Sequence, residues 1–143
     1  MDIDTVRNWL TDNQLKLNDK TLCLELKPSP IHFSYNVGDF PLRVERFFRD
    51  LGVIIDADLK FDLHVHHVVV SSFRLINLLF RIFSLDSVNL YLKFYAAYVI
   101  PAILYCSPLY SESSVRNMNA IESIQKYFTR RLYSRVHPQT ADT

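Results

Sequence analysis

The feature that most constrains the fold is a nearly continuous apolar run, VNLYLKFYAAYVIPAILYC, which covers nineteen residues from Val88 to Cys106. Its length would suffice for a membrane-spanning helix. However, Lys93 and Pro101 interrupt the run, and its tyrosines are spread along it instead of gathering at two membrane interfaces. We therefore expect a buried helix that bends at Pro101, rather than a transmembrane helix.

The composition indicates a folded intracellular protein without a strong bulk charge. Of the 143 residues, 49% are hydrophobic and only two are glycine, which excludes disorder for most of the length. The formal net charge is +1, so any attraction to nucleic acid must come from local clusters. Cys23 and Cys106 lie in apolar stretches, where buried, reduced thiols are expected. The start, MDIDTVRNWL, has no apolar core of signal length, so we expect a cytoplasmic or nuclear protein that is not secreted.

Residues 1–63 are predicted to form a small region of one helix and several antiparallel strands. Apolar residues recur at helical spacing from Asp2 to Thr11, which predicts a short amphipathic helix. Alternating apolar residues and turn signals then predict the strands. Their expected ranges are Thr21–Leu26, His32–Val37, Leu42–Phe48 and Asp50–Ile55, with a hairpin turn at Gly38 and Asp39.

Residues 64–137 are predicted to be helical, and residues 138–143 to be a polar tail. The apolar period changes after Leu63 from that of strands to that of helices. Three helices are expected, covering Val65–Phe83, Ser87 to about Leu109, and Ser114 to about Arg135. The predicted fold class is therefore α+β, in which a small β-hairpin and sheet region with one N-terminal helix precedes a three-helix bundle.

Four sequence blocks occur in an order that resembles a known family. They are WLTDNQLKLNDKT, DLGVIIDADLKFDLHV, LYLKFYAAYVIPAILYCSPLY and IESIQKYFTRRL, and the similarity extends over residues 2–132. Together they resemble the C-terminal part of the reverse transcriptase, an RNA-directed DNA polymerase, of non-LTR (LINE-type, jockey-like) retrotransposons. The resemblance implies that residues 1–63 are the end of the palm with a primer-grip-like hairpin, and residues 64–137 a thumb. Two positions depart from the family pattern: Leu104 stands where an acidic residue precedes Tyr105, and Tyr110 where tryptophan is usual.

Lys20 lies immediately before the first predicted strand, on the lip of a polar turn. It matches a lysine of the family that lies beside the triphosphate of the incoming nucleotide and assists the departure of pyrophosphate. Such a role makes chemical sense because charge grows on the leaving oxygen in phosphoryl transfer, and a nearby ammonium group stabilises that charge. A solvated turn lysine without a task is the alternative.

The metal-binding carboxylates of such a polymerase are not found in this sequence. Nucleotidyl transfer uses two Mg²⁺ ions, and the family holds them with palm aspartates that lie upstream of the segment resembled here. The 143 residues contain no adjacent Asp-Asp pair, and Asp56 and Asp58 are expected to form a turn. The chain is therefore expected to be a truncated fragment, inactive alone and without a metal or cofactor, unless the missing palm region or another chain completes it.

The histidines and serines do not predict a catalytic site either. His64, His66 and His67 are crowded, and no cysteine is near to complete a zinc tetrahedron, so structural roles are expected. The resemblance places His64 at the start of the first thumb helix. No serine lies in a G-x-S-x-G motif, which argues against a serine hydrolase of that kind.

The last predicted helix carries the main candidates for nucleic-acid binding. At about 100° per residue, Arg116, Lys126 and Arg130 lie roughly opposite an apolar stripe and are expected to face outward. Arg131 and Arg135 lie at the edge of the stripe, where long side chains can reach around. The expected stripe residues are Met118, Ile121, Ile124, Phe128 and Leu132. In a thumb, such a face would follow phosphates without reading bases.

Arg43, Arg46 and Arg49 of the predicted hairpin are further candidates. Their spacing by three along a strand spreads them over both faces, so at most two are expected to act together. The expected partner of both sets is an RNA/DNA template-primer duplex, and no membrane partner is expected. The alternatives are a retrotransposon-derived module that binds nucleic acid or protein, and a scaffold whose basic face is only solvated.

Overall fold

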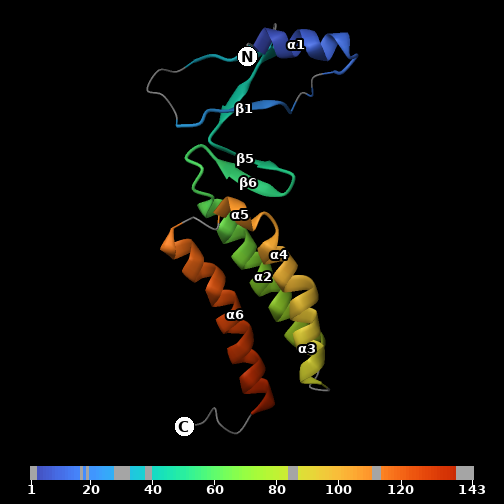
Figure 1. Ribbon diagram of the computed structural model, residues 1–143, viewed down its shortest axis with the longest axis vertical. Helices are drawn as coiled ribbons and strands as arrows, with labels where there is room; N and C mark the ends of the chain where they lie inside the picture. Colours follow the sequence, from blue (N-terminus) through green and yellow to red (C-terminus); the bar gives the residue numbers. More distant parts are fainter. Residues whose placement is uncertain are drawn as a thin grey trace. The chain divides into compact units, whose positions relative to one another are not determined.

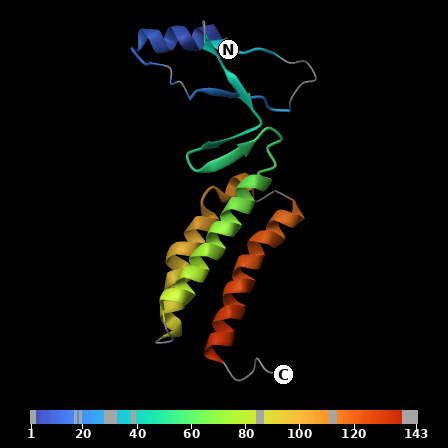
Figure 2. The ribbon, with the colours of Figure 1, turned by 180° about the vertical axis from the view of Figure 1, so that it is seen from behind.

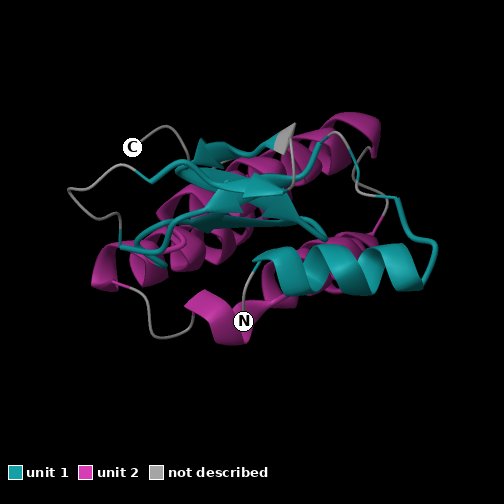
Figure 3. Ribbon diagram, turned by 90° about the horizontal axis from the view of Figure 1, so that it is seen from above, with its two compact units in different colours: residues 1–59 teal, residues 60–143 magenta. Residues whose placement is uncertain are grey.

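The computed structural model describes residues 3–16, 18, 20–27, 33–37, 40–83, 87–110 and 114–137. The architecture is α+β, as predicted from the sequence. The chain divides into two compact units, Met1–Leu59 and Lys60–Thr143, which Figure 3 draws in teal and magenta. The predicted turn residues Gly38 and Asp39, and the tail of residues 138–143, lie outside the described residues.

The first unit begins with helix α1 (Ile3–Asp12), which forms where the apolar spacing predicts a helix (Figure 1). None of its side chains is buried, and Trp9 is 58% exposed. Strands β2 (Asn36–Val37) and β3 (Phe40–Pro41) pair in antiparallel orientation, as expected for a hairpin around residues 38 and 39. Strand β2 is shorter than the predicted range His32–Val37. Strand β3 ends at Pro41, before the predicted second strand Leu42–Phe48 begins, so the prediction of that strand as the partner in this hairpin is wrong.

Strand β1 (Leu22–Leu24) pairs with β4 (Arg43–Glu45) in parallel, with Leu22 opposite Arg43. The prediction of antiparallel strands is therefore wrong for this pair. Parallel strands need a long connection rather than a tight turn, so no local turn signal marks their pairing in the sequence. The strand is also shorter than predicted, and Leu26 beyond its end is 54% exposed.

Strands β5 (Phe47–Asp50) and β6 (Val53–Asp56) form a second antiparallel hairpin. Its turn residues, Leu51 and Gly52, have φ angles of 45° and 91°, as a two-residue type I′ turn requires. The prediction of one strand over Asp50–Ile55 is wrong at its start because the chain reverses there. Leucine is unusual at a left-handed position, so the turn lacks the usual Asn-Gly or Asp-Gly signal.

The second unit is a bundle of three helical segments, as predicted. Its first helix is α2 (Asp62–Ile82) and its last is α6 (Val115–Val136). Between them lie α3 (Val88–Phe94), the π-helical segment η1 (Tyr95–Val99), α4 (Ile100–Leu104) and the short helix α5 (Ser107–Tyr110). Helices α2 and α6 run in the same direction (Figures 1 and 2). The α3–η1–α4 segment, which lies between them in the sequence, runs antiparallel to both.

The middle segment does not simply bend at its proline. Pro101 has no N–H to donate to the carbonyl four residues earlier. Just before it, the Ile100 N–H donates to the carbonyl of Tyr95, five residues earlier, which is the pattern of a π-helix. The helix ends at Leu104, and Cys106 has a left-handed φ of 55°. The prediction of one helix as far as Leu109 is therefore corrected by a break at residues 105 and 106.

The core of the second unit is built by apolar residues from all three segments. Aromatic side chains join them, since the Tyr95 ring stacks on Phe128 at 4.2 Å and the Phe80 ring lies 4.9 Å from Tyr91. The buried residues of this core are Ile76, Leu79, Phe80, Tyr91, Val99, Ile124 and Phe128.

Helix α2 is long and apolar enough to cross a membrane, judged by length and composition alone. Of its most apolar window, 44% is buried against other parts of this chain, and core helices of soluble proteins meet the same criterion. The run from Val88, which the sequence singles out for its length, is divided among α3, η1 and α4.

Cys23 and Cys106 are both free thiols, as expected, but each is only half-buried. Burial, and secondarily the nearby carboxylate of Glu25, raises the pKa of the Cys23 thiol.

Candidate nucleic-acid interface

Helix α6 carries five basic residues and one acidic residue, and three of the basic side chains are exposed as predicted. These three, Arg116, Lys126 and Arg130, define the basic face of α6. The helix begins after Ser114, whose Oγ accepts a hydrogen bond from the Asn117 N–H at 3.4 Å. A serine in this position satisfies one of the unpaired N–H groups at a helix start.

The buried side of α6 differs from the predicted apolar stripe. Ile124 and Phe128 are buried as expected, at 0% and 3% exposure, but Met118 is 45% exposed. Asn117 takes an inward position instead, and its Nδ2 donates to Asp62 Oδ1 of α2 at 2.6 Å. This polar contact joins the beginnings of two helices, and it replaces the apolar contact that the stripe predicts for Met118.

Arg131 and Arg135 turn toward α2 rather than toward solvent. Arg131 Nη1 donates to Asn77 Oδ1 and, at 2.6 Å, to the hydroxyl of Tyr127. Its guanidinium carbon lies 5.2 Å from the centre of the Phe80 ring, within the range of a cation–π interaction. Arg135 Nη1 donates to the Phe80 carbonyl at 3.1 Å, near the end of α2. We therefore leave Arg131 and Arg135 out of the basic face.

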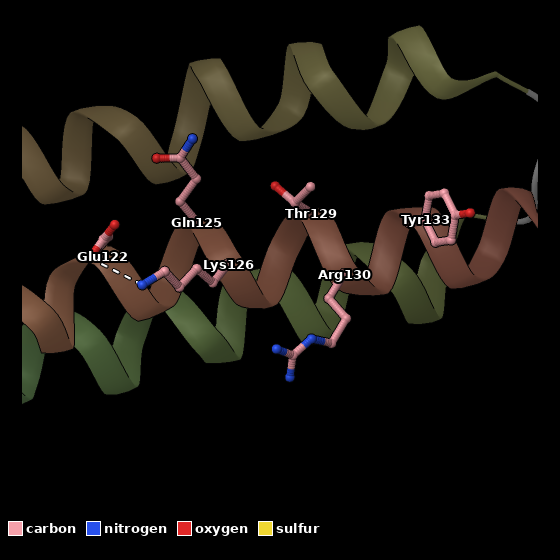
Figure 4. A pocket seen from close by; sticks show the side chains of 6 residues that line it. All are labelled: Glu122, Gln125, Lys126, Thr129, Arg130 and Tyr133. Carbon is pink, nitrogen blue, oxygen red and sulfur yellow. Dashed lines mark ion pairs between the residues drawn. The ribbon is translucent and has the colours of Figure 1, made fainter. Parts of the chain in front are cut away.

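A hollow of about 500 Å³ lies along the exposed side of α6 (Figure 4). Two ridges of side chains line it, and each ridge repeats every four residues along the helix. The cationic ridge consists of Glu122, Lys126 and Arg130, and the neutral ridge of Gln125, Thr129 and Tyr133. In Figure 4 the neutral ridge points to one side of the helix and Arg130 to the other.

The acidic residue of the hollow is paired with one of its cations. Lys126 Nζ lies 3.2 Å from Glu122 Oε2, and the two side chains are 66% and 57% exposed. An exposed pair at this spacing is worth only about 0.3–0.5 kcal/mol. A phosphate group would therefore displace Glu122 from Lys126 at little cost.

In the first unit, Lys20 lies in a turn before β1, as predicted. Its N–H donates to Asn18 Oδ1 at 3.0 Å, and its side chain is exposed. Lys20 and Arg49 line a hollow of about 630 Å³, together with the acidic Glu45 and apolar residues such as Phe47. Sequence reasoning did not connect these two cations, because the parallel pairing of β1 with β4 had no local signal. Arg43 and Arg46 are exposed, and they are not among the described residues that line this hollow.

The other residues that the sequence singled out have structural positions. Asp56 and Asp58 form a turn as predicted, since the Asp58 N–H donates to Asp56 Oδ1 at 3.1 Å. His64 is buried beside Tyr110, with 5.6 Å between ring centres, whereas His66 and His67 are exposed. Within the described part of the chain, no group of three or more His, Cys, Asp or Glu side chains is placed to hold a metal ion.

Comparison with known proteins gives one clear similarity. No protein-family model matches the chain, and no solved structure matches it. An uncharacterized protein from Caenorhabditis elegans is 35% identical over 86 residues, which are 60% of this chain and 43% of that relative. The chain thus matches less than half the length of the relative.

Proposed function

We propose that this chain is related to the palm end and thumb of a non-LTR retrotransposon reverse transcriptase, and that it binds a template-primer duplex without catalysing polymerisation. An α+β unit followed by a helical bundle supports the first part, as does Lys20 on the turn before β1. The proposal includes an intracellular location, cytoplasmic or nuclear, which the free thiols Cys23 and Cys106 support.

The observation that carries the binding proposal is the basic face of α6. Arg116, Lys126 and Arg130 are exposed on one helix, whereas Arg131 and Arg135 are held against α2. Lys and Arg side chains are among the groups with which proteins contact the phosphates of nucleic acids. Such contacts are independent of base sequence, and the release of counterions makes them sensitive to salt.

The role proposed for Lys20 follows from the resemblance and differs from that of α6. Lys20 and Arg49 line one hollow together with Glu45, so an anionic group there would meet two cations and one carboxylate. In an intact enzyme of the family, this position would belong to the leaving pyrophosphate, and Mg²⁺ would be held by palm aspartates of another segment or chain. The proposal for this chain alone is binding, with Arg43 and Arg46 as secondary contacts to the duplex.

The test is a fluorescence-anisotropy titration of an RNA/DNA hybrid with the whole chain at about 0.15 M salt, where the Debye length is about 8 Å. The first variant changes Arg116, Lys126 and Arg130 to Gln. The matched control changes Arg74, Arg81 and Lys93 to Gln, because these are also exposed basic residues of the second unit, on α2 and α3. Both variants lose three positive charges.

We expect the α6 variant to lose at least about tenfold in affinity, since each lost phosphate contact removes a charge-assisted interaction. The control variant should stay within about threefold of the unchanged chain, because general charge alone acts over longer distances and is screened by salt. Equal losses in the two variants, or no loss in either, would contradict the assignment to α6.

A further inference from the structure

We propose that the hollow on α6 holds a single-stranded segment of nucleic acid, with an unpaired base stacked on Tyr133. This inference rests on the proposed function and narrows its substrate class, because the basic face alone would suit any duplex backbone. It is carried by the two ridges that line the hollow, which differ in chemistry.

The cationic ridge fits the backbone of one strand. Lys126 and Arg130 are one ridge step apart, about 6 Å along the helix axis. This spacing suits two neighbouring phosphates of an extended strand. Both side chains reach the hollow, and among the described residues the acidic partner of Lys126 is Glu122, in a weak exposed pair. The two phosphates would therefore lie along the helix rather than across it.

The neutral ridge fits the sugars and the bases. Gln125 offers an amide and Thr129 a hydroxyl, both of which bond to sugar or base edges. Tyr133 ends this ridge with a ring that is 58% exposed, although the His137 ring lies only 4.7 Å from it. An aromatic ring exposed beside two cations is the combination that binds single strands, because every base has a face that stacks on it.

A duplex would leave the neutral ridge without a partner. Paired bases are stacked on one another inside a duplex, so a ring on the surface of a helix does not reach their faces. An unpaired base, such as one in a template strand beyond the end of a primer, exposes its face. Helix α6 also carries a net positive charge. This charge complements the phosphates of a nucleic acid better than it complements a protein surface that has few acidic residues.

The experiment compares three probes of the same length and sequence by anisotropy. They are a single-stranded DNA, the same strand with abasic sites, and a blunt RNA/DNA hybrid. The variants are Tyr133→Leu, which removes the ring, Tyr133→Phe, which keeps it, and Lys126→Gln with Arg130→Gln. Tyr98→Leu is the matched control, since Tyr98 is 59% exposed on η1.

We expect the unchanged chain to bind the normal single strand at least about fivefold more tightly than the abasic strand, the lower end of what base stacking contributes. Tyr133→Leu should abolish that difference, whereas Tyr133→Phe and Tyr98→Leu should retain it. The inference is overturned if Tyr133→Leu retains the difference, or if Tyr133→Phe loses as much as Tyr133→Leu.

The same titrations separate this inference from the proposed function. If the Lys126 and Arg130 double variant weakens binding of every probe while Tyr133→Leu weakens none, the basic face stands and the stacking site does not. If the double variant binds every probe as the unchanged chain does, both fail.

Discussion

At the scale of single residues, Arg130 and Arg131 have opposite roles although they are neighbours in sequence. Arg130 is exposed and lines the hollow, whereas Arg131 is bonded to Asn77 and Tyr127 and lies over the Phe80 ring. Helical spacing could predict that Arg130 faces outward. It could not predict the inward turn of Arg131, which depends on Asn77 being placed opposite it on another helix.

The first prediction is that Arg131 contributes to the stability of the fold and that Arg130 does not. Arg131→Ala should lower the free energy of unfolding by about 1–3 kcal/mol, because it removes hydrogen bonds and a cation–π contact between α2 and α6. Arg130→Ala should change it by less than about 0.5 kcal/mol, as is usual for an exposed side chain. Urea unfolding of both variants, monitored by circular dichroism, measures the two values. A larger loss for Arg130→Ala would be inconsistent with these positions.

The second prediction concerns alkaline pH. Burial raises the pKa of Tyr95, whose ring stacks on Phe128, so the folded state favours the neutral phenol. This contribution to stability is complete below the unfolded pKa of about 10, and it is lost as the pH rises through the higher folded pKa. The melting temperature should therefore fall above about pH 10 in the unchanged chain, and fall less steeply in Tyr95→Phe.

The control for this pH series is Tyr98→Phe, which removes a hydroxyl from a side chain that is 59% exposed. Its melting temperature should follow that of the unchanged chain across the series. If Tyr95→Phe also follows the unchanged chain above pH 10, the buried environment of Tyr95 does not contribute in the way described.

At the scale of elements, helices were predicted more fully than strands. The apolar period and Ser114 were enough to predict α6 and its outward basic residues, since both signals are local. The buried side of α6 was partly missed, because the contact between Asn117 and Asp62 joins residues far apart in sequence. The β1–β4 pair was missed because it also joins residues that are far apart in sequence. The Leu51–Gly52 turn was missed because it lacks the usual sequence signal of a tight turn.

The third prediction tests which side of α6 faces the core. Ile124→Ala should cost about 2–5 kcal/mol of unfolding free energy, because Ile124 is 0% exposed and its truncation leaves a cavity. Met118→Ala, from the same predicted stripe, should cost less than about 0.5 kcal/mol because Met118 is 45% exposed. Thermal or urea unfolding decides between them. Equal losses of unfolding free energy in the two variants would contradict the exposed position of Met118 and favour the apolar stripe predicted from the sequence.

At the scale of the whole molecule, the two units differ in how much they bury. In the described part of the first unit, Val53 and Ala57 are the buried apolar residues, and α1 buries none. The second unit has a core that extends over α2, α3, η1 and α6. Helix α1 therefore offers exposed apolar surface, including Trp9, of the kind on which another polypeptide packs.

The fourth prediction follows from this difference. Amide hydrogens of α1 and β1 should exchange with solvent faster than those of α2 and α6, because few buried contacts oppose local opening in the first unit. Hydrogen exchange followed by mass spectrometry of peptide fragments measures the order. Stronger protection of α1 than of α6 would contradict it.

The central claim is that exposed cations of α6 contact phosphates, and the salt dependence of binding tests it most directly. For a duplex, each phosphate contact contributes about −0.9 to the slope of log K against log salt concentration. Replacing Arg116, Lys126 and Arg130 by Gln should make the slope for an RNA/DNA hybrid shallower by about 3, while the Arg74, Arg81 and Lys93 control leaves it nearly unchanged. The same slope for the unchanged chain and the α6 variant would show that these residues make no phosphate contacts.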